Sequence, residues 1–436
     1  MPTYREVFRV PQFGPLFVTS ALQAAASTTS GLALGVLVFT STGSPLLSAL
    51  SMFGASLAQL AGAALLMSAA DRLPPRGALS GAALAFGIGT AVLALPGLPL
   101  PLVFAVVLGE GAVAAVMGGV RYGLLGEVLP KDAFLLGRSL LNMCAGTMQI
   151  LGYAAGGVLV AVLAPRGTLL VAAALYAAGA TAAWFGLGRR PPRATGRPSV
   201  GETWRTNALL WSSGPRRRVY LSLWLPNGLV VGCESLFVPY RPDRAGLLFA
   251  CAALGMLAGD TVTGRFLPAR WRGRLRTPLL LLLAVPYLLF ALRPGLPWAL
   301  LLATVASTGF SASLLLQERL MALTPATMTG QALGLHSSGM LAMQGVAAAL
   351  AGALAQRIPT GGAIALMAAA SVAVTLILAP GLRRAGGPED GETPAARRSP
   401  GARIRVTATE AAAISAIAPP VGIRCARAPA SAAATP

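Results

Sequence analysis

The chain has 436 residues, of which 55% are hydrophobic and 11% are charged, well below the ~25% charged content that is usual in soluble domains. Apolar stretches near 20 residues recur along the whole sequence, and each is long enough to cross a hydrocarbon core of ~30 Å as a helix. This composition excludes a soluble globular protein. The net charge of +20 does not indicate a nucleic-acid partner, because the arginines stand between apolar spans and no basic groove with interleaved aromatic residues is present.

The predicted fold class is an all-α polytopic membrane protein. Short turns rich in Gly, Pro and Ser, such as Pro96–Pro99, separate the apolar stretches. The twelve predicted transmembrane helices are 13–38, 45–69, 78–97, 100–122, 139–163, 167–187, 219–240, 245–266, 277–293, 296–317, 331–356 and 360–380.

One long polar interruption divides the spans into two sets of six. Residues 188–218 carry eight arginines and one acid, Glu202, and we predict a basic cytoplasmic linker there between six-helix bundles at 1–187 and 219–380. Residues 381–436, rich in Ala, Pro, Arg and Gly, predict a disordered cytoplasmic tail. Without linker and tail, the segments on the side of the N-terminus hold thirteen Lys and Arg against five on the other side, which places both termini in the cytoplasm of a plasma (inner) membrane protein.

The two halves contain an internal repeat. Five positions recur at a constant offset of 195 residues, among them Met148-Gln149 with Met343-Gln344, and Gly157 with Gly352. The matched residues start and line the fifth and eleventh predicted spans. Two related sets of six spans form the parallel-repeat arrangement of a secondary transporter, with a pseudo-two-fold axis along the membrane normal.

The segment after the second predicted span carries a recognisable motif. The chain resembles the major facilitator superfamily, whose loop between spans 2 and 3 reads Gly-x-x-x-Asp-Arg-x-Gly-Arg-Arg. Asp71, Arg72 and Arg76 fit this pattern, whereas Met67 and Pro74 replace its glycines and a proline replaces one basic residue. The resemblance covers residues 1–380.

The resemblance implies a gate at the cytoplasmic end of the spans. Asp71 would face the N-terminus of span 11, where the helix dipole favours a carboxylate, and Arg72 and Arg76 would hold the loops together. Asp260 and Arg265, after span 8, form a looser second copy of the motif. The alternative is that these residues are ordinary topology signals beside a turn.

The fifth predicted span resembles a second family motif. Gly152-Tyr153-Ala154-Ala155-Gly156-Gly157 resembles the end of the antiporter signature Gly-Pro-x-x-Gly-Gly in the drug-efflux branches of the family, without its proline. This resemblance implies export by a bacterial efflux-like transporter. Close helix packing explains the same glycines without any function.

Two acids lie well inside predicted spans, where acids are costly and usually functional. Glu110 is ~14 Å into span 4 and occupies the Gln position of the family pattern Arg-x-x-Gln-Gly, whose arginine is here Val107. We predict that Glu110 and Glu234 couple transport to protons. The alternatives are a neutral hydrogen-bonded carboxyl for Glu110 and an ion pair with Arg241 or Arg244 for Glu234.

Polar residues recur at helical spacing on spans that the family plan places around the substrate cavity. They also suit hydrogen bonding between helices, which remains the alternative. The predicted cavity residues are Gln23, Ser27, Ser30, Asn142, Gln149, Asn227, Ser307, Thr308 and Ser311.

Together these features predict a secondary active transporter that exports a small organic compound in exchange for protons. An uptake permease for a small metabolite and a non-transporting membrane sensor remain the alternatives. No Gly-x-x-x-x-Gly-Lys-[Ser/Thr] phosphate loop is present, and a single histidine without a metal-spaced cluster indicates no enzyme, metal or cofactor. The predicted partners are a small-molecule substrate, protons and the lipid bilayer, and the chain is predicted to be a monomer.

Overall fold

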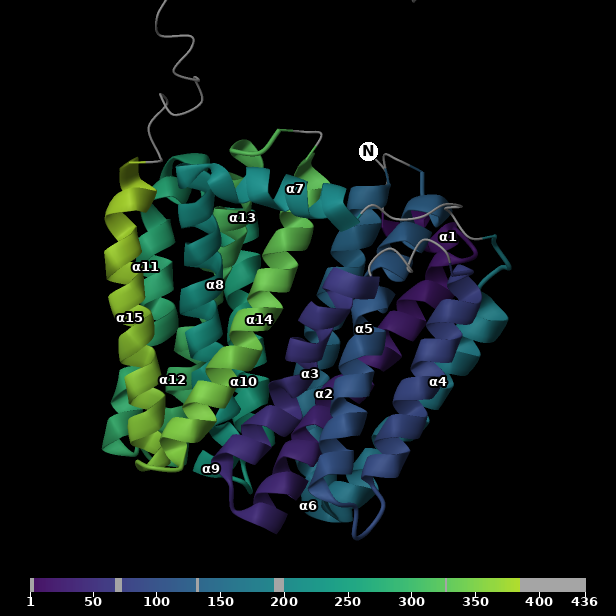
Figure 1. Ribbon diagram of the computed structural model, residues 1–436, viewed down its shortest axis with the longest axis horizontal. Coiled ribbons are helices and arrows are strands. Elements are labelled where there is room, and N and C mark those ends of the chain that lie inside the picture. Colours follow the sequence, from purple (N-terminus) through teal and green to yellow (C-terminus); the bar gives the residue numbers. More distant parts are fainter. Residues whose placement is uncertain (1–3, 67–72, 131–132, 192–199, 326–327, 385–436) are drawn as a thin grey trace, which may run out of the picture. The chain divides into compact units, whose positions relative to one another are not determined.

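The computed structural model describes residues 4–66, 73–130, 133–191, 200–325 and 328–384. Within these ranges all regular secondary structure is helical (Figure 1). The elements are α1 (Tyr4–Arg9), α2 (Phe13–Thr42), α3 (Pro45–Leu66), α4 (Pro75–Leu93), α5 (Leu100–Val128), α6 (Phe134–Gly186), α7 (Val200–Ser212), α8 (Gly214–Ser235), α9 (Phe237–Tyr240), α10 (Ala245–Phe266), α11 (Ala269–Leu288), η2 (Leu289–Leu292), α12 (Leu296–Thr308), η3 (Gly309–Ser311), α13 (Ala312–Ala322), α14 (Thr329–Ala355) and α15 (Thr360–Arg384).

The described helices make twelve passes, which confirms the predicted number. Ten helical segments are long and apolar enough to cross a membrane. One of them, α6, is two helices joined at Ala164, whose φ of 58° and ψ of 168° are not helical. Pro165 follows and lacks the N–H that a continuous helix would need. The second limb of α6 is therefore an eleventh pass, and the 22 residues of α3 supply the twelfth.

The helix pairings repeat between the two halves. In the first half α2 packs on α6, α3 on α5 and α4 on α6; in the second half α8 packs on α14, α10 on α12 and α11 on α15. The halves meet through α3 with α14 and through α10 with α6, which are also equivalent pairs. The fold is thus two six-helix bundles related by a pseudo-two-fold axis.

The repeat glycines lie where the two halves touch. A Cβ atom on Gly157 would lie 3.1 Å from the Cα of Gly246, and one on Gly352 would lie 2.6 Å from the Cα of Leu46. Two helix backbones approach this closely only where side chains are absent. The recurring glycines are therefore packing positions of the two equivalent contacts between the halves.

The helices have a linker end and a loop end. The linker end holds α1, α7 and the last residues of α15, all towards the top of Figure 1. The loop end holds the turns on the opposite side, at residues 43–44, 94–99, 164–165, 241–244, 293–295 and 356–359.

The predicted linker contains a helix that the sequence analysis did not predict. Residues 192–199 lie outside the described ranges, but Val200–Ser212 form α7, and α8 already begins at Gly214. Leu210 is fully buried, and the ring of Trp211 stacks on that of Trp224 at 5.6 Å between centroids. Burial of these apolar side chains offsets the cost of ordering a segment that is otherwise polar. The cytoplasmic location of the linker and the limits of the two bundles remain predictions, and most of the predicted tail, 385–436, is outside the described residues.

Large apolar side chains cover much of the outer surface of the helices. Phe185 is 83% exposed, Ile377 76% and Val162 73%. Exposure on this scale is unfavourable in water and is expected where lipid tails surround a helix. The exposed residues thus agree with a multi-pass membrane protein.

Candidate functional site

The main cavity lies inside the first half. Its volume is about 410 Å³, and α2, α3, α4, α5 and the second limb of α6 line it. Apolar residues such as Leu34, Met52 and Phe86 form part of the wall. The polar residues in the lining are Gln23, Ser27, Ser30, Ser51, Ser56, Gln59, Thr90, Glu110, Arg121 and Tyr176.

Glu110 faces this cavity from α5. Its Oε1 accepts a hydrogen bond of 3.4 Å from the hydroxyl of Thr90 on α4. The carboxyl group therefore makes the hydrogen bond to a neighbouring helix that the structural alternative expects, and it also lines a polar cavity. Its role in coupling stays a prediction.

Arg121 lies on the same face of α5 and lines the same cavity. The two Cα atoms are eleven residues apart, or ~16 Å along the helix axis, so the acid and the base stand towards different ends of the cavity. The guanidinium of Arg121 donates a hydrogen bond to the side-chain oxygen of Gln23 on α2. The hydroxyl of Tyr176 lies close to Ser27 and Ser30 on α2. The predicted polar stripe of span 1 therefore does face the cavity.

Glu234 belongs to a second polar cluster, inside the other half. It is 6% exposed, and its Oε1 accepts hydrogen bonds from Tyr287 on α11 at 3.3 Å and from Ser307 on α12 at 3.5 Å. Arg244, one of the two expected ion-pair partners, instead pairs with Asp243 at 3.4 Å. Glu234 is thus held between three helices by hydroxyl groups.

Replacing Tyr287 with phenylalanine tests this cluster. Tyr287→Phe leaves the buried carboxyl with one hydroxyl donor, so we expect the free energy of unfolding to fall by about 1 kcal/mol. Unfolding in mixed micelles measures the change. In a double-mutant cycle, Glu234→Ala should remove most of the effect of Tyr287→Phe. Fully additive effects would show that the hydroxyl and the carboxyl do not interact.

The remaining predicted cavity residues do not line the main cavity. The amide of Asn227 donates to Ser313 at 3.2 Å, and Thr308 donates to a carbonyl of its own helix. Ser311 is fully buried, Asn142 is exposed, and Gln149 lies beside the hydroxyl of Tyr153. Whether these residues contact a substrate stays a prediction.

The predicted gate is only partly described. Asp71 and Arg72 lie outside the described residues. The guanidinium of Arg76 lies 4.4 Å from the ring centroid of Trp184, in a cation–π contact. Asp260, on α10, has one buried carboxylate oxygen without a hydrogen-bond partner in the described part of the chain, and Arg265 is exposed in the last turn of that helix. The gating role of these residues remains a prediction.

The sequence analysis missed several polar residues that the helices bring to the two carboxyl groups. Thr90 and Tyr287 are isolated polar residues in apolar spans, and nothing in their spacing marks them. Ser51, Ser56 and Gln59 in α3 could have been found, because their spacing of five and three residues places them on neighbouring parts of one helix face.

Comparison with known proteins places this arrangement in a family. The profile of the Major Facilitator Superfamily matches residues 16–314. A lysophospholipid transporter, LplT, from Salmonella gallinarum is 30% identical over 234 residues, which are 48% of this chain and 56% of that protein. LplT from Yersinia enterocolitica is 28% identical over 233 residues, or 48% of this chain and 55% of that protein. The chain therefore spans about half the length of these curated relatives.

Solved structures with low sequence identity share the fold. A POT family transporter crystallised with a thioalcohol-conjugated peptide has a TM-score of 0.68 at 14% identity, over 86% of this chain and 96% of that one. A bacterial homologue of the human lysosomal transporter Spinster, solved inward-facing and unoccupied, has a TM-score of 0.62 at 15% identity, over 86% and 97% of the two chains. The family profile covers more than half of the sequence, and the chain therefore belongs to the Major Facilitator Superfamily.

Proposed function

We propose that this protein is a secondary active transporter that exports a small organic compound in exchange for protons. The observation that carries the proposal is Glu110, a carboxyl group within an apolar bundle that faces a polar cavity. Acids at this depth are costly in a membrane and commonly form proton paths. In alternating access, Glu110 would take up a proton from one side and release it on the other as substrate moves the opposite way.

Other described acids are less suited to this role. Glu127 pairs with Arg190 at 3.2 Å, and Glu318 pairs with Arg272 at 3.1 Å, both at the linker end. Glu234 is enclosed by hydroxyl groups and does not line the main cavity. We therefore assign proton coupling first to Glu110 and second to Glu234. The proposed setting is a bacterial plasma membrane, with a monomer whose termini are both cytoplasmic.

A proteoliposome flux assay tests the proposed function. The purified full chain is reconstituted, a pH gradient is imposed, and a panel of lipophilic compounds is followed. We expect at least one compound to move against the proton flow, and to stop moving when an ionophore collapses the gradient. Flux that does not change when the pH gradient is imposed or collapsed would contradict proton coupling. A lack of flux for the whole panel would favour the non-transporting sensor.

A second candidate is movement of a lysophospholipid-like amphiphile into the cell. The names of the two relatives favour a lysophospholipid as the transported compound. So does the cavity wall, which combines apolar Leu34 and Phe86 with the charged groups of Glu110 and Arg121. A labelled lysophospholipid in the same panel separates the candidates, because accumulation without a pH gradient would favour uptake over proton-driven export.

A further inference from the structure

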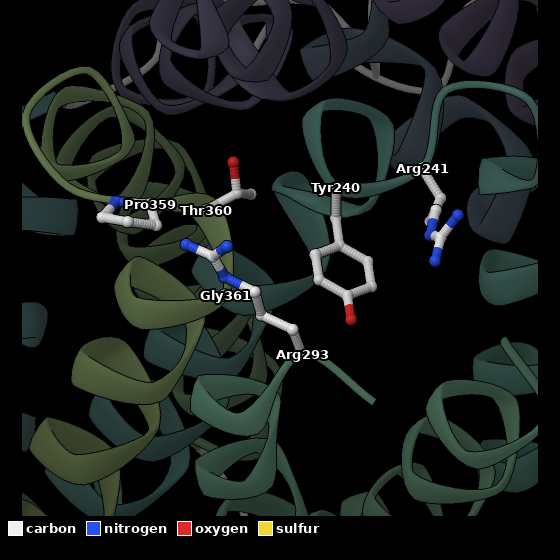
Figure 2. Close-up of a pocket in the computed structure, with 6 residues that line it drawn as sticks. All are labelled: Tyr240, Arg241, Arg293, Pro359, Thr360 and Gly361. Carbon is white, nitrogen blue, oxygen red and sulfur yellow. The ribbon is translucent and has the colours of Figure 1, made fainter. Parts of the chain in front are cut away.

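A separate cavity lies at the loop end of the second half. Its volume is about 330 Å³, close to the lower end of the range for small-molecule sites. Three segments line it, namely the end of α9, the end of η2 and the start of α15 (Figure 2). The lining residues are Tyr240, Arg241, Arg293, Pro359, Thr360 and Gly361.

Two exposed arginines line this cavity on opposite sides of the Tyr240 ring (Figure 2). Both guanidinium groups act electrostatically on the hydroxyl of Tyr240, and Figure 2 shows the tyrosine ring between them. Within the described residues neither Arg241 nor Arg293 has a side-chain ion pair or hydrogen bond, and the lining contains no acid. Two positive charges in one cavity repel each other, and an anion bound in the same cavity lowers the free energy of this arrangement.

The first turn of α15 adds backbone donors to the same cavity. The first intrahelical hydrogen bond runs from the N–H of Ala363 to the carbonyl of Pro359 at 3.0 Å. The three amides before it therefore have no acceptor inside the helix. Pro359 has no side-chain oxygen that could cap them. These amides, at the positive end of a 25-residue helix, favour a bound anion.

The segments that carry these groups are fixed in place. The hydroxyl of Tyr240 donates to the carbonyl of Pro294 at 3.1 Å. A Cβ on Gly361 would lie 2.4 Å from the carbonyl oxygen of Phe290, so α15 starts in direct contact with η2. Arg293 has a φ of 52°, a left-handed conformation that is unfavourable for a residue with a Cβ. The cavity is thus set by the fold before any ligand binds.

Exposed apolar residues near Arg293 along the chain indicate that the cavity lies at the level of lipid headgroups. Leu292, directly before Arg293, is 79% exposed, and Trp298, in the first turn of α12, is 65% exposed. Tryptophan is enriched at the boundary between headgroups and hydrocarbon, and an exposed leucine at a helix end faces lipid tails. A ligand that has its anionic group in this cavity would keep its apolar part in the bilayer.

We propose that this cavity binds a phosphate group, carried by a lipid headgroup or free as inorganic phosphate. The two guanidinium groups and the three backbone amides supply more hydrogen-bond donors than the two oxygens of a carboxylate can accept. A phosphate group offers three or more acceptor oxygens. The site does not depend on the proposed transport cycle, and its test needs no substrate.

Binding to the purified full chain tests the proposal in two arms. In uncharged detergent, inorganic phosphate is titrated calorimetrically at constant ionic strength. In nanodiscs of digalactosyldiacylglycerol, a bilayer lipid without phosphate, a small fraction of spin-labelled phosphatidic acid reports immobilised lipid. Binding in the lipid arm alone assigns the site to a headgroup, binding in the phosphate arm alone assigns it to the free anion, and binding in both assigns it to the phosphate group itself. No saturable binding in either arm overturns the proposal.

Matched variants localise the binding. We expect Arg241→Gln and Arg293→Gln each to weaken binding about tenfold or more. Arg166→Gln removes an exposed arginine at the loop end of the other half and should leave binding unchanged. Arg293→Gly relieves the left-handed strain while removing the charge, so it should bind as weakly as Arg293→Gln without any loss of thermal stability. Equal weakening by Arg166→Gln, or full binding by Arg293→Gly, would refute the site.

Discussion

Glu110→Gln is expected to abolish pH-driven export while leaving substrate binding intact. Glutamine has nearly the shape of a protonated glutamate and still accepts the hydrogen bond from Thr90, but it carries no exchangeable charge. The coupled cycle needs Glu110 to take up and release a proton, whereas exchange of labelled substrate without a gradient does not. The expected result is therefore a complete loss of pH-driven flux in proteoliposomes together with preserved exchange.

The matched control for this variant is Glu318→Gln. Glu318 is at the linker end, where its half-exposed side chain pairs with Arg272, so its neutralisation should leave pH-driven flux unchanged. Full pH-driven transport by Glu110→Gln would transfer the coupling role to Glu234. If Glu110→Gln lost binding and protein abundance together, the hydrogen bond to Thr90 would be structural.

Gly246→Val is expected to reduce transport by about five- to 150-fold. A Cβ at this position would lie 2.6 Å from the Cα of Gly157 and 2.8 Å from the carbonyl oxygen of Tyr153. The clash separates α10 from α6 at the loop end, where the two halves touch. Overpacking of this kind costs about 1–3 kcal/mol, which shifts a two-state equilibrium by the stated factor. Initial rates of substrate flux measure the loss.

A second measurement shows whether transport is lost because the loop end no longer stays closed. In Gly246→Val, cysteines introduced near the loop end should react faster with a water-soluble maleimide, because that end opens more often. The control is Gly81→Val, on α4, where a Cβ meets nothing within 4 Å and transport should persist. Unchanged maleimide rates combined with lost transport would contradict the explanation.

The two-fold repeat extends this prediction to the equivalent contact. Gly352 packs on Leu46 where α14 crosses α3, as Gly157 packs on Gly246. Because both contacts close the same end, they belong to one conformational step. The constant repeat offset predicted that these positions are equivalent, and the structure shows that both are glycine contacts between the halves.

Glu110 and Glu234 show which parts of the candidate site can be predicted from the sequence. Glu110 stands out in the sequence because an acid deep in an apolar span is costly. Its partner Thr90 does not stand out, because a threonine hydroxyl in a helix can donate its hydrogen bond to a backbone carbonyl of the same helix at little cost. For Glu234 the sequence suggested Arg241 or Arg244, which are near along the chain, whereas the fold supplies Tyr287 and Ser307 from other helices.

The sequence by itself determined the number of passes, the division into two related halves and the resemblance to a transporter family. Span length and hydrophobicity are local properties that the bilayer thickness dictates, so they can be read without knowing which helices touch. Only the tertiary structure decided that the main cavity lies within the first half, that α7 packs on the second half, and that Arg241 and Arg293 meet at the start of α15. These features depend on how each helix is rotated about its axis. Because these helices are apolar on nearly all sides, their sequence pattern does not mark the buried face. Packing against segments that are distant along the chain determines the rotation instead.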